Sequence, residues 1–292
     1  MSTQRTRIRC MGVPEHFNLP WILAIDDGAF EAEGIDIEWV EAFGGTGEMS
    51  QALYHGEADM ALLLTEGALT SILTGNKSFI HSVYVDSPLV WGVYAGAKST
   101  ASTGQLQQAP FVVSRMYSGS HLMGYWYAAE HKRKAVASDF HAVGDIDGAV
   151  KALTEQPDRL FLWEKTTTSP YVDRKVFRLV DECVAPWPAF VAVVRNGLDP
   201  ARLAAVERAI AIVRNYAADL ELSEEEGADL VAYMYDIKPK QARQWLDQVR
   251  FSRTGKIDLE KLGQAASTLH RLGILEALPS AERLAEICRL DA

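Results

Sequence analysis

Residues 36–67 read DIEWVEAFGGTGEMSQALYHGEADMALLLTEG, and the rest of the chain can be placed around this stretch. Apolar residues alternate over residues 35–39, as in a β-strand, and a glycine-rich turn follows at residues 44–47. Residues 48–55 have helical spacing, and residues 58–65 form a second apolar run. This order of strand, turn, helix and strand predicts a βαβ unit, which requires a parallel sheet and a right-handed crossover.

The turn Gly44–Gly47 could let a ligand approach the backbone, because its glycines carry no side chain and a helix begins there. Its spacing differs from the dinucleotide fingerprint, and no Gly-Lys-Ser/Thr follows as in a phosphate-binding P-loop. The alternative is an ordinary turn in which Thr46 caps the helix.

Bulk composition narrows the functional class. The chain has 292 residues, of which 48% are hydrophobic and 23% charged, as in a globular protein with a substantial core. Its 29 basic and 39 acidic residues give a net charge of −10. This balance argues against nucleic acid and anionic membranes as partners, although a local pocket could still bind a small anion.

Cysteine usage and the N-terminal sequence bear on location. Cys10, Cys183 and Cys288 are far apart and form no C-x-x-C pair, which is typical of reduced thiols. Residues 1–17 do not contain the apolar run of a secretory signal. No apolar run in the sequence reaches the length of a membrane span. We therefore expect a cytoplasmic protein without a membrane span, or a periplasmic one if an export signal has been removed.

The strand and helix rhythm occurs twice. Residues 7–95 alternate strands and helices, residues 96–109 are small and polar and predict a loop, and a second α/β rhythm covers residues 111–194. From Pro200 onward all segments have helical spacing. The pattern predicts an α/β protein with two doubly wound sheets and C-terminal helices that cover the first.

Ligands of open α/β sheets bind beyond the carboxyl ends of the strands. We therefore expect the ligand-binding residues in the loops that follow the strands. The residues that we expect to bind ligand are His16, Asn18, Gly45, Thr46, Gly47, Thr65, Glu66, Ser87, Arg115, Ser118, Gly119, Ser120, His121, Trp163, Glu164 and Lys165.

The best anion candidate is Ser118–His121, where hydroxyls and free N–H groups meet at a helix start and Arg115 could add a bidentate contact. An N-cap with a solvated arginine is the alternative. Glu164 and Lys165 could contact a ligand, or they could form an exposed ion pair at the rim of the site. The seven histidines show no metal-binding spacing, so no metal or cofactor is expected.

Several motifs resemble the type II periplasmic-binding-protein fold, and more closely its branch of alkanesulfonate-binding proteins and thiamine pyrimidine synthases. The matching positions are Ala24, Gly28, Phe30, Gly34-Ile35, Gly44–Gly47, Leu53, Gly56-Glu57, Asp59 and Ala61. LLTEG (63–67), SRMYSGSHLM (114–123) and FLWEKTTTSPYVD (161–173) resemble an intracellular group from fungi and bacteria whose ligand is unassigned.

The resemblance implies two lobes that clamp one ligand. Lobe 1 would comprise residues 1–92 and 195–292, lobe 2 residues 93–194, with hinge strands near 90–95 and 189–195. Gly92 and the region of Phe190 would absorb the rotation between the lobes.

The resemblance also implies a solute-binding protein for a small anionic or heteroaromatic metabolite. The alternatives are a cytosolic lyase or biosynthetic enzyme of the thiamine- or menaquinone-pathway type, or the substrate-binding component of an ABC transporter, with a permease as partner if exported. The chain lacks the closely spaced cysteines of the pyrimidine synthases, which argues against their chemistry.

Overall fold

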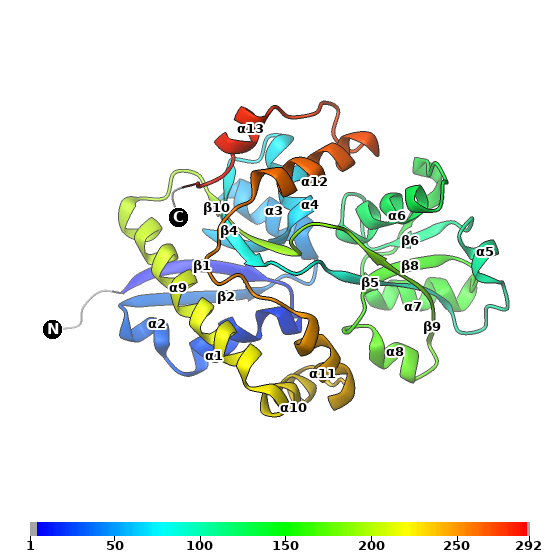
Figure 1. The fold of residues 1–292 in the computed structure, drawn as a ribbon, viewed down its shortest axis with the longest axis horizontal. Helices are drawn as coiled ribbons and strands as arrows, with labels where there is room; N and C mark the ends of the chain where they lie inside the picture. The colour runs from blue at the N-terminus through cyan, green and yellow to red at the C-terminus, as the bar shows by residue number, and fades with distance from the viewer. Residues whose placement is uncertain (1–4, 291–292) are drawn as a thin grey trace.

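The computed structural model describes residues 5–290, which form two lobes side by side (Figure 1). The ends of the predicted lobe 1, residues 1–4 and 291–292, lie outside the described residues. The sheet of lobe 1 has the order β2-β1-β3-β10-β4. Its strands are β1 (Thr6–Gly12), β2 (Ile35–Glu41), β3 (Met60–Leu64), β4 (Ser78–Val85) and β10 (Phe190–Arg195).

The sheet of lobe 2 has the order β7-β6-β8-β5-β9. Its strands are β5 (Val90–Gly96), β6 (Phe111–Val113), β7 (Phe140–Ala142), β8 (Leu160–Glu164) and β9 (Phe177–Val184). In each lobe three of the strands pair in parallel, whereas β10 runs antiparallel to both β3 and β4, and β5 runs antiparallel to both β8 and β9. One strand that enters from the other lobe therefore interrupts each parallel sheet.

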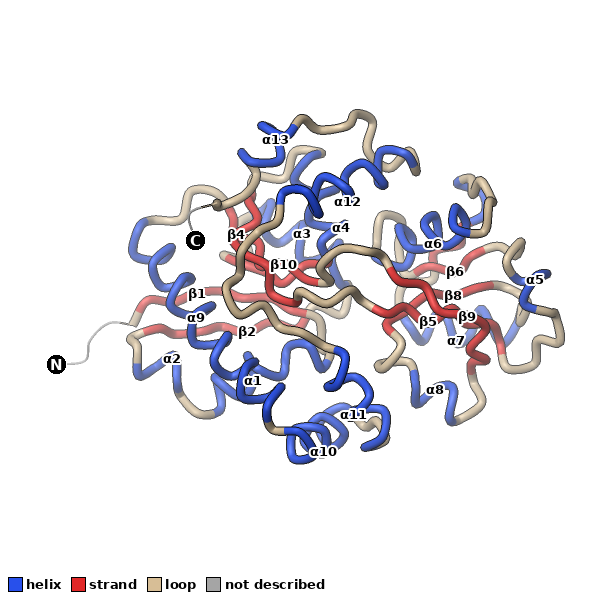
Figure 2. The backbone as a smooth tube through the Cα atoms, viewed as in Figure 1, coloured by secondary structure: helices blue, strands red, loops and turns tan. Residues whose placement is uncertain are grey.

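Short helices connect the strands within each lobe (Figure 2). Those of lobe 1 are η1 (His16–Asn18), α1 (Leu19–Asp26), α2 (Ala29–Ala32), α3 (Gly45–His55) and α4 (Thr65–Leu73). Those of lobe 2 are α5 (Thr103–Leu106), α6 (Gly119–Glu130), η2 (Ala137–Asp139), α7 (Ile146–Glu155) and α8 (Ser169–Asp173).

The chain crosses between the lobes at residues 86–89 and again at 185–189, outside the strands. The predicted hinge strands, near 90–95 and 189–195, follow directly on these crossings. Residues 90–95 lie in β5 of lobe 2, and residues 190–195 form β10 of lobe 1. Gly92 is an interior residue of β5, where an added Cβ would lie 2.0 Å from the Tyr94 hydroxyl. A larger residue at this position would therefore require the Tyr94 side chain to move.

Two local expectations were wrong. The predicted loop at residues 96–109 contains helix α5, which the Ser102–Gln105 capping box begins. The helical spacing of Ile22, Ile25, Ala29 and Phe30 predicts one helix over residues 21–32. The structure divides it into α1 and α2, because Gly28 adopts a left-handed conformation with φ of 68°.

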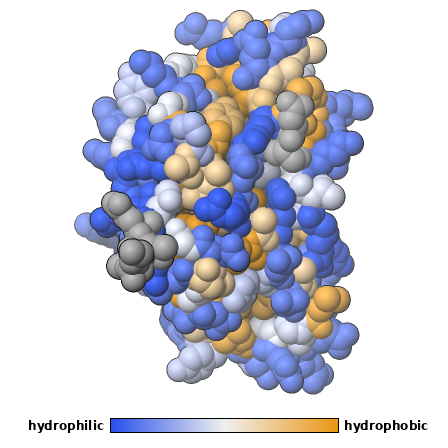
Figure 3. Space-filling model, turned by 90° about the vertical axis from the view of Figure 1, so that its left-hand side faces the viewer, coloured by the Kyte–Doolittle hydropathy of each residue, from blue (hydrophilic) through white to orange (hydrophobic). Residues whose placement is uncertain are grey.

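The C-terminal helices pack mainly on lobe 1, as predicted. They are α9 (Pro200–Leu222), α10 (Glu224–Tyr235), α11 (Pro239–Gln248), α12 (Leu259–Arg271) and α13 (Ala281–Glu286). Helix α9 lies against α1 and β1, and α12 lies against α4. Figure 3 shows a mostly hydrophilic surface at the lobe 1 end, with the apolar patches scattered. No described helix has the length and apolar character that a membrane crossing needs.

Candidate functional site

A small cavity of about 60 Å³ lies between the two lobes, at the ends of their strands. It has walls from both lobes: Thr46 comes from lobe 1 and Ser120 from lobe 2. The lining residues are Val13, Glu15, Gly44, Gly45, Thr46, Leu64, Leu89, Trp91, Ser114, Arg115, Ser118, Gly119, Ser120, Trp163, Glu164 and Phe190. The cavity thus lies at the strand ends, where the strand-end rule expects a ligand.

The loop after β1 is held in place by two hydrogen bonds. Asn18 Nδ2 donates to Val13 O at 2.7 Å, and the Tyr84 hydroxyl donates to Phe17 O at 2.6 Å. Asn18 therefore shapes the loop instead of lining the cavity. The loop presents Glu15 to the cavity and buries His16 behind it.

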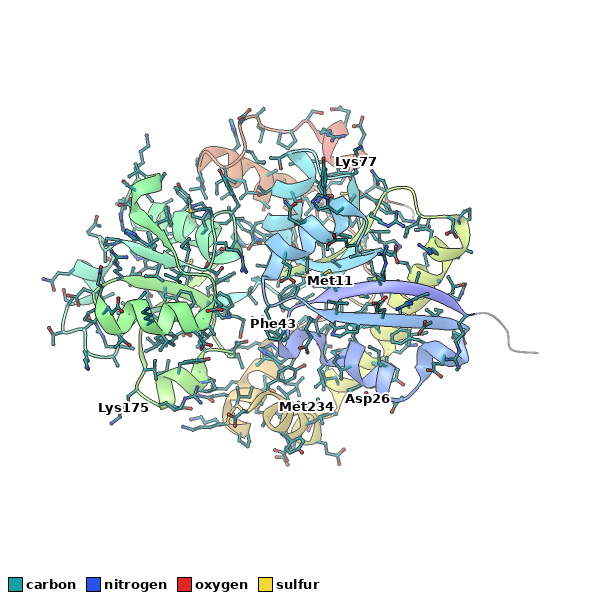
Figure 4. All side chains as sticks on the ribbon, turned by 180° about the vertical axis from the view of Figure 1, so that it is seen from behind. Met11, Asp26, Phe43, Lys77, Lys175 and Met234 are labelled. Carbon is teal, nitrogen blue, oxygen red and sulfur yellow. The ribbon has the colours of Figure 1, made fainter. Side chains whose placement is uncertain are left out.

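The turn before α3 forms another part of the lobe 1 wall. Helix α3 begins at Gly45, so Thr46 lies inside its first turn and is not the N-cap. Gly44 N donates to Glu48 Oε2 at 2.5 Å, and Leu64 N donates to Thr46 Oγ1 at 3.4 Å. These bonds join the turn to α3 and to the end of β3. Figure 4 places the exposed Phe43, just before this turn, on the edge of lobe 1 toward lobe 2.

The start of α6 forms the facing wall in lobe 2. Ser118 caps the helix by accepting from His121 N at 3.4 Å, and Ser120 Oγ accepts from Ser114 N at 3.0 Å. These hydroxyls thus bond mainly within their own turn. Among residues 5–290 the amides of Gly119 and Ser120 have no hydrogen-bond acceptor, and the Arg115 side chain has no ion-pair partner.

Two carboxylates from opposite lobes line the same cavity. Burial and, to a lesser extent, the Glu164 carboxylate raise the pKa of Glu15 to about 8, against the lowering effect of a hydrogen bond from Trp163. His16 Nε2 lies 3.8 Å from Glu164 Oε2, and both side chains are buried. Burial lowers the pKa of His16, against the influence of Glu164, so His16 is neutral at pH 7. Glu164 Oε2 also accepts from Thr167 N at 2.6 Å.

Half of the predicted site residues lie elsewhere. Thr65 Oγ1 donates to Pro188 O at 2.5 Å and Glu66 Oε2 accepts from Trp187 Nε1 at 2.9 Å, so both hold the second crossing segment. His121 packs edge-on against Phe140 in the lobe 2 core, where burial lowers its pKa to about 4. His16, Asn18 and Gly47 do not line the cavity either.

Ser87 and Lys165 belong to a second interlobe cavity of about 290 Å³, on the side of α11. Lys165 Nζ lies 2.6 Å from Glu182 Oε1, so Lys165 forms its ion pair with Glu182 and not with Glu164. Glu164 borders both cavities.

The sequence list omitted the remaining lining residues. Glu15 and Ser114 lie in loops that the strand-end rule selects, and only their individual roles were missed. Leu64, Leu89, Trp91 and Phe190 are apolar positions at strand ends or crossings, and no polar signal marks them. Within residues 5–290 no cluster of His, Cys, Asp and Glu side chains could hold a metal ion.

Comparisons with known proteins agree with this architecture. Residues 91–183 match the family model described as Ca3427-like PBP. The Candida albicans CA3427 gene product, described as having the generic periplasmic binding protein fold, superposes with a TM-score of 0.89 at 23% identity, over 97% of this chain and 96% of that one. No curated protein sequence matches the chain.

Two structures that are described as those of ligand-binding proteins are also similar. The alkanesulfonate-binding protein SsuA from Xanthomonas axonopodis pv. citri, bound to MOPS, has a TM-score of 0.79 at 13% identity, over 98% of this chain and 99% of that one. The nitrate-binding protein NrtA from Synechocystis has a TM-score of 0.72 at 12% identity, over 99% and 87%. The chain thus has the two-lobed periplasmic-binding-protein fold, and its second lobe matches the Ca3427-like model of that fold.

Proposed function

We propose that the protein binds a small organic anion in the cavity between its lobes. The observation that carries the proposal is Arg115, a guanidinium without an ion-pair partner among residues 5–290 that lines the cavity next to the free amides of Gly119 and Ser120. Arginine and a helix N-terminus both favour anions. Similar structures that are described as binding alkanesulfonates and nitrate support this class of ligand.

The cavity limits the size of the ligand. Its volume of about 60 Å³ is far below the roughly 300–1,000 Å³ of sites for drug-sized molecules. The indoles of Trp91 and Trp163 line the cavity, where they can pack against apolar or planar parts of a ligand. A compact ligand of a few heavy atoms beyond its anionic group fits this description.

Replacement of Arg115 tests the proposal. Small carboxylates and sulfonates should raise the melting temperature of the wild type, and Arg115→Ala should weaken their binding about 10- to 100-fold, because it removes a charge-assisted hydrogen bond. Arg208→Ala, on an exposed part of α9, is the matched control and should bind as the wild type does. Equal binding by all three proteins would contradict the proposal.

A second candidate function is proton-transfer catalysis in the same cavity, which the raised pKa of Glu15 favours. Small molecules recovered from the native protein would then change in mass or connectivity on incubation with fresh protein. In this case Glu15→Gln should retain binding and lose turnover. Recovery of every molecule unchanged would support binding alone.

A cytoplasmic location is part of the proposal. Its support is the cysteine usage: Cys10, Cys183 and Cys288 are all free thiols, and the first two are buried. Fractionation of the native host tests it, because appearance of the protein in the periplasmic fraction would favour an ABC import component instead.

A further inference from the structure

We propose that the ligand is a zwitterion, whose cationic nitrogen binds between Glu15 of lobe 1 and Glu164 of lobe 2 while its anionic group binds Arg115. This inference rests on the proposed function and specifies its ligand class. The three side chains line one cavity, so a single small molecule can contact all of them.

Among the described residues, Glu164 is a buried carboxylate that no cation accompanies. Glu66 lacks a cation there as well, but it lies outside the cavity and accepts a hydrogen bond from Trp187 Nε1. Asp59 is equally buried but lies within 3.6 Å of three arginines, Arg9, Arg195 and Arg202. Glu164 is 4% exposed, and among residues 5–290 no lysine or arginine forms an ion pair with it; the neutral ring of His16 lies 3.8 Å away. Buried carboxylates are normally paired, so a ligand cation would supply the missing partner.

Glu15 adds a second acceptor from the opposite lobe. The charged group that acts on it is Glu164 across the cavity, while His16 on its own loop and Tyr235 on α10 are neutral. Among residues 5–290 no lysine or arginine forms an ion pair with Glu15. The indoles of Trp91 and Trp163 line the cavity as well, and aromatic faces attract organic cations.

The buried His16 beside Glu164 is neutral, so it supplies no positive charge to that carboxylate. A cation that pairs with Glu164 would therefore have to come from a ligand. His16 Nε2 has no hydrogen-bond partner among the described residues, and the ring packs edge-on against Trp245 at 4.4 Å. Because His16 stays neutral, the carboxylate beside it remains available to a ligand.

Matched pairs of probes test the inference by calorimetry. Taurine and propane-1-sulfonate are nearly isosteric and share the sulfonate, but only taurine has an ammonium group; β-alanine and butanoate form the corresponding carboxylate pair. The ammonium member of a pair should bind about tenfold tighter or more, because it adds charge-assisted hydrogen bonds. Glu164→Gln should abolish this preference, and Glu33→Gln, at an exposed position of lobe 1, should retain it.

Proton release gives an independent readout. Glu15 is mostly protonated at pH 7, because its pKa is about 8. An ammonium group should therefore displace up to about one proton, seen as a binding heat that differs between phosphate and Tris buffers. Propane-1-sulfonate should release none, and Glu15→Gln should release none with either probe.

The outcomes separate this inference from the proposed function. Equal affinity within both pairs, or a preference that survives Glu164→Gln, overturns the zwitterion and leaves the anion site intact. No binding by any of the four probes overturns the anion site as well. Stabilisation by Zn²⁺ that Glu164→Gln removes would show that the carboxylates bind a metal, and would also overturn the inference.

Discussion

At the scale of single residues, the raised pKa of Glu15 makes the stability of the protein depend on pH. This pKa is raised from 4.5 to about 8, so the folded chain holds this proton more tightly than the unfolded chain does. The contribution of Glu15 to stability is therefore greatest below its ordinary pKa, and it is lost as the pH rises toward 8.

Glu15→Gln should reduce this loss of stability at high pH. We expect the melting temperature to fall less between pH 5 and pH 8.5 than in the wild type, by about 2 °C or more, since the variant has no carboxyl to ionise. Thermal denaturation across this range is the measurement, with Glu33→Gln as control. A variant with the wild-type pH profile would show that the pKa of Glu15 is not raised in the folded protein.

At the scale of elements, the start of α6 is fitted closely to lobe 1. A Cβ added at Gly119 would lie 2.5 Å from Leu64 Cδ1 of lobe 1 and 2.8 Å from Trp91 of lobe 2. The glycine therefore permits the two lobes to approach at the cavity.

Gly119→Ala should hold the lobes apart and weaken ligand binding about tenfold, because added atoms in a closely packed contact cost about 1–3 kcal/mol. Gly104→Ala is the control, because a Cβ there meets no atom within 4 Å. Calorimetry with the tightest-binding probe compares the two variants. The prediction is wrong if both bind equally well.

The second crossing segment depends on one hydrogen bond of Trp187. Trp187→Phe should destabilise the protein by about 1–3 kcal/mol, since it leaves the buried Glu66 carboxyl without its donor. The pKa of Glu66, already raised by burial, should rise further. Urea denaturation measures the effect, and an unchanged midpoint would mean that the bond contributes nothing.

At the scale of the whole molecule, the sequence predicted the architecture better than the site. Period-two and helical spacing identify most elements, and the strand-end rule locates the cavity. The rule does not tell which side chain in a loop faces the ligand. Thr65 and Glu66 follow a strand as Thr46 does, but they bond to Pro188 and Trp187, more than 100 residues away.

The position of the crossings also depends on distant contacts. The apolar stretch around Ser87-Pro88 reads locally as one β-rich segment, yet its halves join different sheets. Only the pairing of β4 with β10 and of β5 with β8 and β9 decides where the chain leaves each lobe. Such pairings join segments far apart in sequence, which local periodicity does not reveal.

The central claim is that a small molecule is clamped between the lobes at Arg115 and Gly119. Native mass spectrometry of the protein, purified gently from its own host, tests it most directly. We expect a small-molecule adduct in the wild type and in Gly104→Ala that is strongly depleted in Gly119→Ala and Arg115→Ala. An adduct of equal occupancy in all four proteins, or none in the wild type, would show that no ligand is held at Arg115 and Gly119.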